Sequence, residues 1–200
     1  LSVCILPIAP VKDSAEFTPA VAPPAGPIGG VTTNLSDYAN GQVPQYQKFE
    51  ISFDLTGTTA TNPYFAYDPS PPPGVEAGTG ITVDALLLPP GETNWSNAKT
   101  LPCFYYQPVE EVGSSDNADL LPVGTPEWRC RFTPEITGTW QYKIRATDAD
   151  GTSESTVHQF ACALSNNKGF VRTSATDPRF FEFADGTPRS EEHTSELQSL

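Results

Sequence analysis

The chain has 200 residues, a formal net charge of −13 and a sequence pI near 4.4, and it contains 21 prolines and 15 glycines. So many prolines exclude long helices, and the acidic balance excludes binding to nucleic acid or to an anionic membrane through a basic surface. No apolar run approaches the roughly 20 residues that span a bilayer, so no membrane span is expected. We therefore expect an all-β domain with tails.

Residues 1–44 show no hydrophobic period over most of their length. The run FTPAVAPPAGPIGGVTT is rich in Pro, Ala, Thr and Gly, which is typical of an extended linker. We interpret 1–44 as a linker or as the remnant of an upstream segment. The opening LSVCILPIAP fits the end of a signal peptide's apolar region, but it lacks the basic start, and a strand or linker explains it as well.

The first clear strand is predicted over 48–55, KFEISFDL, where apolar and polar residues alternate strictly. The following segment, 56–80, is polar and rich in proline, which predicts a long connection without regular hydrogen bonding. This connection carries three aromatic residues, Tyr64, Phe65 and Tyr67.

Two further strands are predicted before the middle of the chain. The run ITVDALLL, 81–88, is apolar on more than one face, and LPCFYYQ, 101–107, is rich in aromatic residues. Trp95 falls in an exposed loop between them. Residues 110–124 are acidic and polar, and we expect a loop that projects from the sheet edge.

Residues 128–151 show the strongest pattern in the chain. Two alternating runs flank a short linker with Pro134 and Gly138, and Asp150-Gly151 is a turn dipeptide that closes the second run. We interpret the two runs as a β-hairpin with one dry face. The residues predicted on that face are Trp128, Cys130, Phe132, Trp140, Tyr142, Ile144 and Ala146.

The last strands are predicted over 155–164, 169–174 and 179–183. The first completes about six strands with the turn spacing of a β-sandwich. The other two are short, and we expect them to follow the sandwich as a small hairpin.

Candidate sites for chemistry are few. The spacing of Cys4, Cys103, Cys130 and Cys162 contains no CxxC pair and disfavours zinc. A disulfide between Cys130 and Cys162 and buried free thiols both remain open. Other polar candidates have simpler explanations: His158 as a strand residue, Asp148, Asp150 and Glu154 as a hairpin turn, and Glu110 and Glu111 as solvated charges. No cofactor and no metal are expected.

Four motifs together resemble a known module: KFEISFDL, NPYFAYDPSPPPG, WRCRFTPEITGTWQYKIRATDADG and NKGFVRTSATDPRFFEFADGTP. They are similar to the immunoglobulin-like domain of unknown function that precedes the catalytic barrel of certain bacterial glycoside hydrolases. The resemblance covers roughly Gln45 to Pro188. It implies an immunoglobulin-like or fibronectin III-like β-sandwich over 45–165, followed by the start of a truncated barrel over 166–188.

The resemblance also implies a role. The chain would be the non-catalytic N-terminal module of a secreted or cell-surface hydrolase, inactive by itself, with its own downstream catalytic domain as partner. The implied contacts between the two domains are Phe170, Arg172, Asp177 and Phe181. RSEEHTSELQS, Arg189 to Ser199, resembles the conceptual translation of a sequencing adapter, so 189–200 is interpreted as an artefact rather than as a genuine acidic terminus.

Two other functions remain open. Sugars stack on exposed aromatic rings, so Tyr64, Phe65, Tyr67 and Trp95 would suit a module that binds polysaccharide. The same residues would equally plug the ends of the sandwich or contact the barrel. A structural or adhesion domain in a longer cell-surface array is the third possibility.

Overall fold

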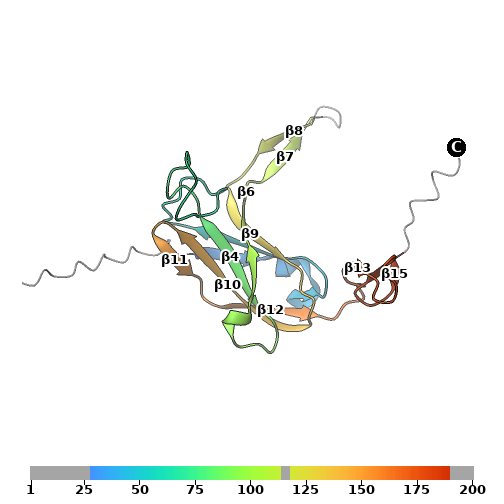
Figure 1. The fold of residues 1–200 in the computed structure, drawn as a ribbon. Coiled ribbons are helices and arrows are strands. Elements are labelled where there is room, and N and C mark those ends of the chain that lie inside the picture. The colour runs from blue at the N-terminus through green and yellow to red at the C-terminus, as the bar shows by residue number, and fades with distance from the viewer. Residues whose placement is uncertain (1–27, 114–117, 190–200) are drawn as a thin grey trace, which may run out of the picture.

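The computed structural model describes residues 28–113 and 118–189, which form two facing β-sheets, a projecting hairpin and a small C-terminal sheet (Figure 1). The predicted all-β sandwich is therefore confirmed. Three short 3-10 segments lie between strands, and no helix within these two ranges is long and apolar enough to cross a membrane.

Each sheet of the sandwich mixes strands from distant parts of the chain. Sheet 1 has the order β1 (Ile28–Thr33), β3 (Phe49–Leu55), β9 (Glu127–Phe132) and β6 (Phe104–Tyr106). Sheet 2 has the order β2 (Gln42–Pro44), β12 (His158–Ala163), β10 (Gly138–Asp148), β4 (Thr82–Leu88) and β5 (Lys99–Pro102), with β11 (Gly151–Glu154) also paired to β10. The β2–β12 pair is parallel and the other pairs are antiparallel. Two facing sheets of mainly antiparallel strands are the arrangement of a β-sandwich.

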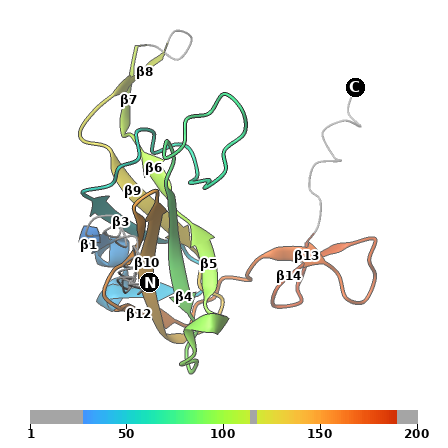
Figure 2. The same ribbon diagram turned by 60° about the vertical axis from the view of Figure 1, so that its left-hand side comes forward.

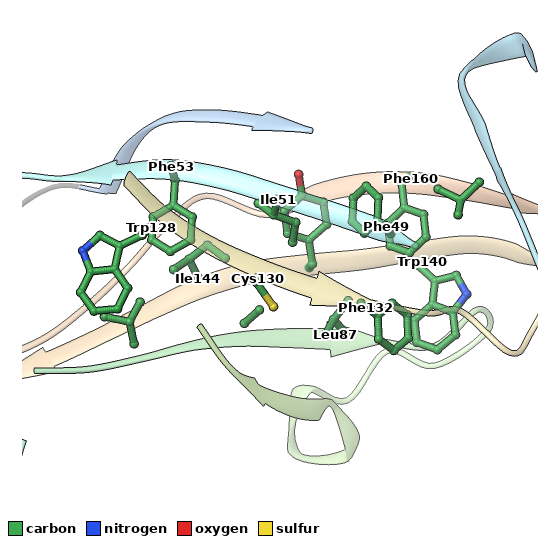
Figure 3. Close-up of a cluster of buried hydrophobic side chains, with 14 of the residues drawn as sticks. Phe49, Ile51, Phe53, Leu87, Trp128, Cys130, Phe132, Trp140, Ile144 and Phe160 are labelled. Atoms are coloured by element: carbon green, nitrogen blue, oxygen red, sulfur yellow. The ribbon is translucent and has the colours of Figure 1, made fainter. Parts of the chain in front are cut away.

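The core lies between the two sheets. Alternate residues of β3 and β9 point inward from sheet 1, and alternate residues of β10 and β12 meet them from sheet 2 (Figure 3). Aromatic rings dominate: Phe49 stacks on Phe160 with centroids 3.9 Å apart, and Phe132 meets Trp140 edge-on at 4.9 Å. Strand β4 is buried on both faces near its end, as its apolar run predicts, because Leu86 and Leu88 on the outer face are covered too.

The hairpin predicted over 128–151 is wrong in its pairing, although the faces of its strands are right. Strand β9 pairs with β3 and β6, whereas β10 pairs with β4, β11 and β12, so the linker crosses from one sheet to the other. A hairpin would place the apolar residues of both strands on one face of one sheet. The linker instead forms an arch between the sheets, so the apolar face of β9 packs against the apolar face of β10. The real hairpin is β10–β11, closed at Asp150-Gly151 as predicted.

The strand predicted over 101–107 is two strands. The chain leaves sheet 2 after β5, passes Cys103, and enters sheet 1 as β6. The loop predicted over 110–124 also differs, since it contains the hairpin β7 (Val109–Val112) and β8 (Asp119–Pro122), which projects from the sandwich (Figure 2). All eight of its strand residues are exposed, so side-chain periodicity gives no burial signal there.

The linker expected over 1–44 is wrong for its last part. Residues 28–44 form β1, the 3-10 segments Asn34–Asp37 and Ala39–Gly41, and β2, and both strands lie at sheet edges. The Asn34 side chain secures this region, because it accepts from the Glu50 amide at 2.8 Å and donates to the Lys48 carbonyl at 3.2 Å. Residues 1–27 lie outside the described part of the chain.

The last strands form a separate sheet beside the sandwich. The predicted short hairpin is β13 (Val171–Thr173) with β14 (Phe181–Phe183), and β15 (Pro188–Arg189) adds a third strand. Arg189 thus pairs with Phe181, while residues 190–200 of the suspected adapter tail lie outside the described residues.

Replacing Trp140 by alanine tests the core. The Trp140 ring is fully buried, contacts Phe132 and Phe160, and donates from Nε1 to the Ile136 carbonyl at 2.8 Å. We expect Trp140→Ala to lower the free energy of unfolding by about 3–5 kcal/mol. Denaturant titration measures it, with the exposed neighbour Thr139→Ala as control; a loss below about 1 kcal/mol for Trp140→Ala would contradict this packing.

Candidate functional site

A cavity of about 280 Å³ opens where the 63–66 segment covers the crossover into β6. Its walls come from that segment, from β4 and from the β6–β9 pair. The aromatic residues that line it are Tyr64, Phe65, Phe104, Tyr105 and Trp128. A concave, largely apolar site with a few polar groups is the kind of place where proteins bind small ligands.

A row of rings leads from the core to solvent at this cavity. Trp128 is buried at the end of the core, and the centroid of the Tyr105 ring lies 5.4 Å from that of Trp128. The Tyr64 ring meets the Tyr105 ring edge-on, with centroids 5.6 Å apart. The Tyr64 side chain is 68% exposed, so its ring is open on one side. Tyr105 therefore holds Tyr64 in place without covering it.

The 56–80 loop that carries Tyr64 is fixed by backbone contacts. The Ile81 amide donates to the Phe65 carbonyl at 2.8 Å, and the Tyr67 amide donates to the Thr82 hydroxyl at 3.1 Å. At Gly80 a side chain would not fit, because a Cβ would lie 2.3 Å from the Ala66 carbonyl oxygen. These contacts hold the loop against the start of β4.

A buried carboxylate anchors the start of the same loop. Asp148, at the end of β10, accepts from the Thr58 hydroxyl at 2.7 Å and from the Thr59 amide at 3.2 Å. Its other oxygen accepts from the Asp150 amide at 3.0 Å. Asp148 is thus a tether between the β10–β11 turn and the loop, which is a structural role for a residue of the predicted turn.

Asp84 supplies the carboxylate of the cavity wall. Burial raises the pKa of this carboxyl, and the nearby Arg145 guanidinium partly offsets the rise. A carboxyl group among aromatic rings can hydrogen-bond a hydroxyl of a bound ligand. Over the described ranges, no three His, Cys, Asp or Glu side chains are arranged to hold a metal ion.

The structure does not bring the four candidate aromatic residues together. Tyr64 and Phe65 line the cavity above, and Phe65 and Tyr67 also line a neighbouring hollow of about 440 Å³ within the loop. Trp95 lies in the 3-10 segment Trp95–Asn97 at the other end of the sandwich (Figures 1 and 2). It is half-buried there, with the Lys143 ammonium 4.8 Å from its ring.

The residues predicted to contact a second domain lie on the C-terminal sheet, away from the cavity. The Phe170 ring meets Tyr46 edge-on at 5.7 Å and is still 50% exposed, and Phe181 is 46% exposed. Arg172 pairs with Glu182 at 3.0 Å, and Asp177 accepts from Arg179 at 2.7 Å. The two charged residues are thus satisfied within the segment, while the two aromatic ones are partly open.

Sequence reasoning missed several residues of the cavity. Tyr105 and Asp84 lie on predicted strands and carry no motif, and only the sheet crossover at Cys103 brings them to one opening. The one sequence feature that could have indicated these cavity residues is the high proportion of aromatic residues in LPCFYYQ. His158 is a strand residue as predicted, and its ring stacks on Tyr142 with centroids 5.2 Å apart.

Comparison with known proteins gives little. No protein-family profile and no curated protein matches the sequence. Among solved structures, the chain is similar to a crystal structure described as that of "a putative glycoside hydrolase" from Bacteroides vulgatus, with 19% identity and a TM-score of 0.44. The match covers 74% of this chain and 21% of that chain, so the chain spans about a fifth of its neighbour's length. A similarity of this degree assigns no function.

Replacing Asp148 tests the tether. We expect Asp148→Ala to lower the free energy of unfolding by about 1–3 kcal/mol, since it removes the buried acceptor of the part-buried Thr58 hydroxyl and Thr59 amide bonds. Hydrogen exchange of the Thr59 amide should accelerate in parallel. The half-buried turn residue Asp150→Ala is the control; unchanged Thr59 exchange in Asp148→Ala would show that the loop is held by other contacts.

Proposed function

We propose that the chain is a non-catalytic accessory module of a secreted glycoside hydrolase, and that its C-terminal sheet packs on a catalytic domain of the same polypeptide. Three features support this proposal. They are the resemblance of its four motifs to such modules, the strand order of the sandwich, and the surface of the C-terminal sheet.

The exposed aromatic surface of the C-terminal sheet carries the proposal. The apolar residues open to solvent in this segment are Phe170 (50%), Val171 (39%), Phe180 (62%) and Phe181 (46%). Three strands of two or three residues are too short to bury these rings among themselves. Clustered exposed apolar side chains mark contact surfaces, so a second body is expected to cover them.

The sheet is attached to the sandwich along one narrow contact. Gly169 approaches Tyr46 so closely that a Cβ would lie 2.9 Å from the tyrosine ring. The Asn167 side chain donates to the Tyr46 carbonyl at 3.4 Å, and the Ser165 hydroxyl donates to the Gln45 carbonyl at 2.7 Å. One end of the sheet is thereby held while Phe180 and Phe181 remain open, as an element between two domains requires.

The carboxylates of the cavity favour a non-catalytic role. Glycoside hydrolases use a pair of carboxyl groups roughly 5–10 Å apart that flank the scissile bond. Among the described residues that line the cavity, Asp84 is the one carboxylate, so the cavity lacks such a pair. We therefore assign catalysis to the partner domain.

Removing the aromatic surface tests this proposal. We expect the chain to self-associate with rising concentration, and Phe180→Ser/Phe181→Ser to reduce association because it removes the apolar surface. Sedimentation velocity measures it. Leu120→Ser/Leu121→Ser is the matched control, since these residues of β8 are 65% and 50% exposed. Equal association of the two double variants would contradict a specific role for the C-terminal sheet.

A second candidate function, carbohydrate binding, is favoured by the cavity at Tyr64. An open ring beside the Asp84 carboxyl matches the stacking and hydrogen-bonding needs of a sugar. If the cavity binds polysaccharide, Tyr64→Ala should weaken retention in affinity electrophoresis by about tenfold or more. Trp95→Ala, at the other end of the sandwich, should leave retention unchanged. No retardation of the unaltered chain on any polysaccharide tested would remove this candidate.

A further inference from the structure

Two cysteine thiols meet at the crossover between the sheets. In the β6–β9 register, Tyr105 lies opposite Trp128 and Phe104 lies opposite Arg129. Continuing that register by one position places Cys103, the residue just before β6, opposite Cys130 of β9, and both cysteines are free thiols. The Cys103 backbone is also fixed on its other side, because its amide donates to the Val83 carbonyl of β4 at 2.8 Å.

The spacing of antiparallel neighbours suits a disulfide. Directly opposed residues have Cα atoms roughly 4.5 or 5.5 Å apart, depending on the hydrogen-bonding site. Disulfides join cysteines whose Cα atoms are roughly 4.4–6.8 Å apart. Either spacing would therefore allow Cys103 and Cys130 to join without moving the strands.

The two thiols differ in access. Cys103 is half-buried and lines the cavity beside Tyr64, whereas Cys130 is fully buried in the core. Cys162 has different neighbours. It belongs to β12 and lies opposite Gly138 of β10, and its thiol donates to the Ala163 carbonyl at 3.9 Å. The structure thus places Cys130 beside Cys103 rather than beside Cys162, and all three are free thiols.

We propose that Cys103 and Cys130 form an intramolecular disulfide by exchange with an external disulfide, such as oxidised glutathione. The Cys103 thiolate attacks one sulfur of the external disulfide and releases one thiol, which leaves a mixed disulfide on Cys103. The Cys130 thiolate then attacks the Cys103 sulfur and releases the second thiol. Two protein thiols and one external disulfide thus give one protein disulfide and two external thiols.

The environment of Cys103 sets the pace of this exchange. The hydrogen bond with Cys130 and then burial raise the pKa of the Cys103 thiol well above its usual range. Since the thiolate is the nucleophile, exchange should be slow at neutral pH and should accelerate as pH rises.

The bond would constrain the part of the fold that sequence predicted least well. It would tie β9 of sheet 1 to the crossover between β5 and β6, and would close the 104–129 segment, including the projecting β7–β8 hairpin, into a loop. It would also fix one wall of the cavity. This inference is independent of the accessory role, so either proposal can fail alone.

Peptide mapping of the folded chain tests the proposal. After incubation with oxidised glutathione at mildly alkaline pH, we expect the intact mass to fall by the two hydrogens lost on forming one disulfide. Trypsin separates all four cysteines, into 1–12, 100–129, 130–131 and 146–168. Non-reducing digestion should link 100–129 to 130–131, and the oxidised chain should melt about 5–10 °C higher than the reduced chain.

Variants separate the outcomes. Cys162→Ala should keep the linked peptides and the thermal shift, whereas Cys103→Ser should lose both and still fold, because Cys103 is only partly buried. Because a kinetic barrier could prevent oxidation of the folded chain, the same mapping is repeated after refolding in a glutathione redox buffer. A link from 130–131 to 146–168, glutathione retained on Cys103, or free thiols under both conditions would overturn the proposal.

Discussion

The face-to-face packing of β9 on β10 is the interaction on which the rest of this structure depends. Each strand presents a largely apolar face, and the short linker between them arches from one sheet to the other so that these faces meet. The contact between Phe132 and Trp140 fixes the arch. The linker is also connected to the C-terminal segment through Tyr46. The Tyr46 amide donates to the Pro134 carbonyl at 3.0 Å, and the Tyr46 ring contacts Phe170.

The crossover at Cys103 is the second determinant of the architecture. One continuous run of sequence contributes a strand to each sheet, because β5 is an edge strand of sheet 2 and β6 is an edge strand of sheet 1. The sandwich is open at this point, and the 63–66 segment covers the opening only in part. The cavity, the exposed Tyr64 ring and the thiol pair all follow from this single change of sheet.

Sequence alone predicted the faces of the strands better than their partners. Alternation identified the buried side of β3, β9 and β10 correctly, because burial of one face is what alternation records. It could not distinguish an arch from a hairpin, since both have the same pattern. The edge strands β1 and β2 were missed because they pair mainly through backbone, and Val43 is the one fully buried side chain of β2.

For the candidate sites, the sequence predicted which residues are exposed but not which of them lie together. Exposure of Tyr64, Phe65 and Phe181 followed from their place in loops or short strands. Their separation did not follow, because the distance between loops depends on the sheet crossover. Trp95 shows the limit clearly: a tryptophan in a polar loop suggested a binding surface, and in the fold it packs with Lys143 at the far end of the sandwich.

The proposed accessory role would give the two apolar surfaces different tasks. The cavity at Tyr64 is small, whereas the surface of Phe180 and Phe181 is open and lies on a sheet with one narrow attachment. A sandwich joined in this way would orient a neighbouring domain through the C-terminal sheet. The acidic surface of the chain, with a net charge of −13, would keep the assembled protein dispersed.

Hydrogen–deuterium exchange on a longer polypeptide, in which the proposed catalytic domain follows this chain, tests this account most directly. Exchange over 170–183 is compared with exchange over the same residues in the present chain. If the C-terminal sheet packs on a catalytic domain, these amides should exchange more slowly in the longer polypeptide, by on the order of tenfold or more, while those of β10 remain unchanged. Equal exchange of 170–183 in both proteins would contradict the proposed docking.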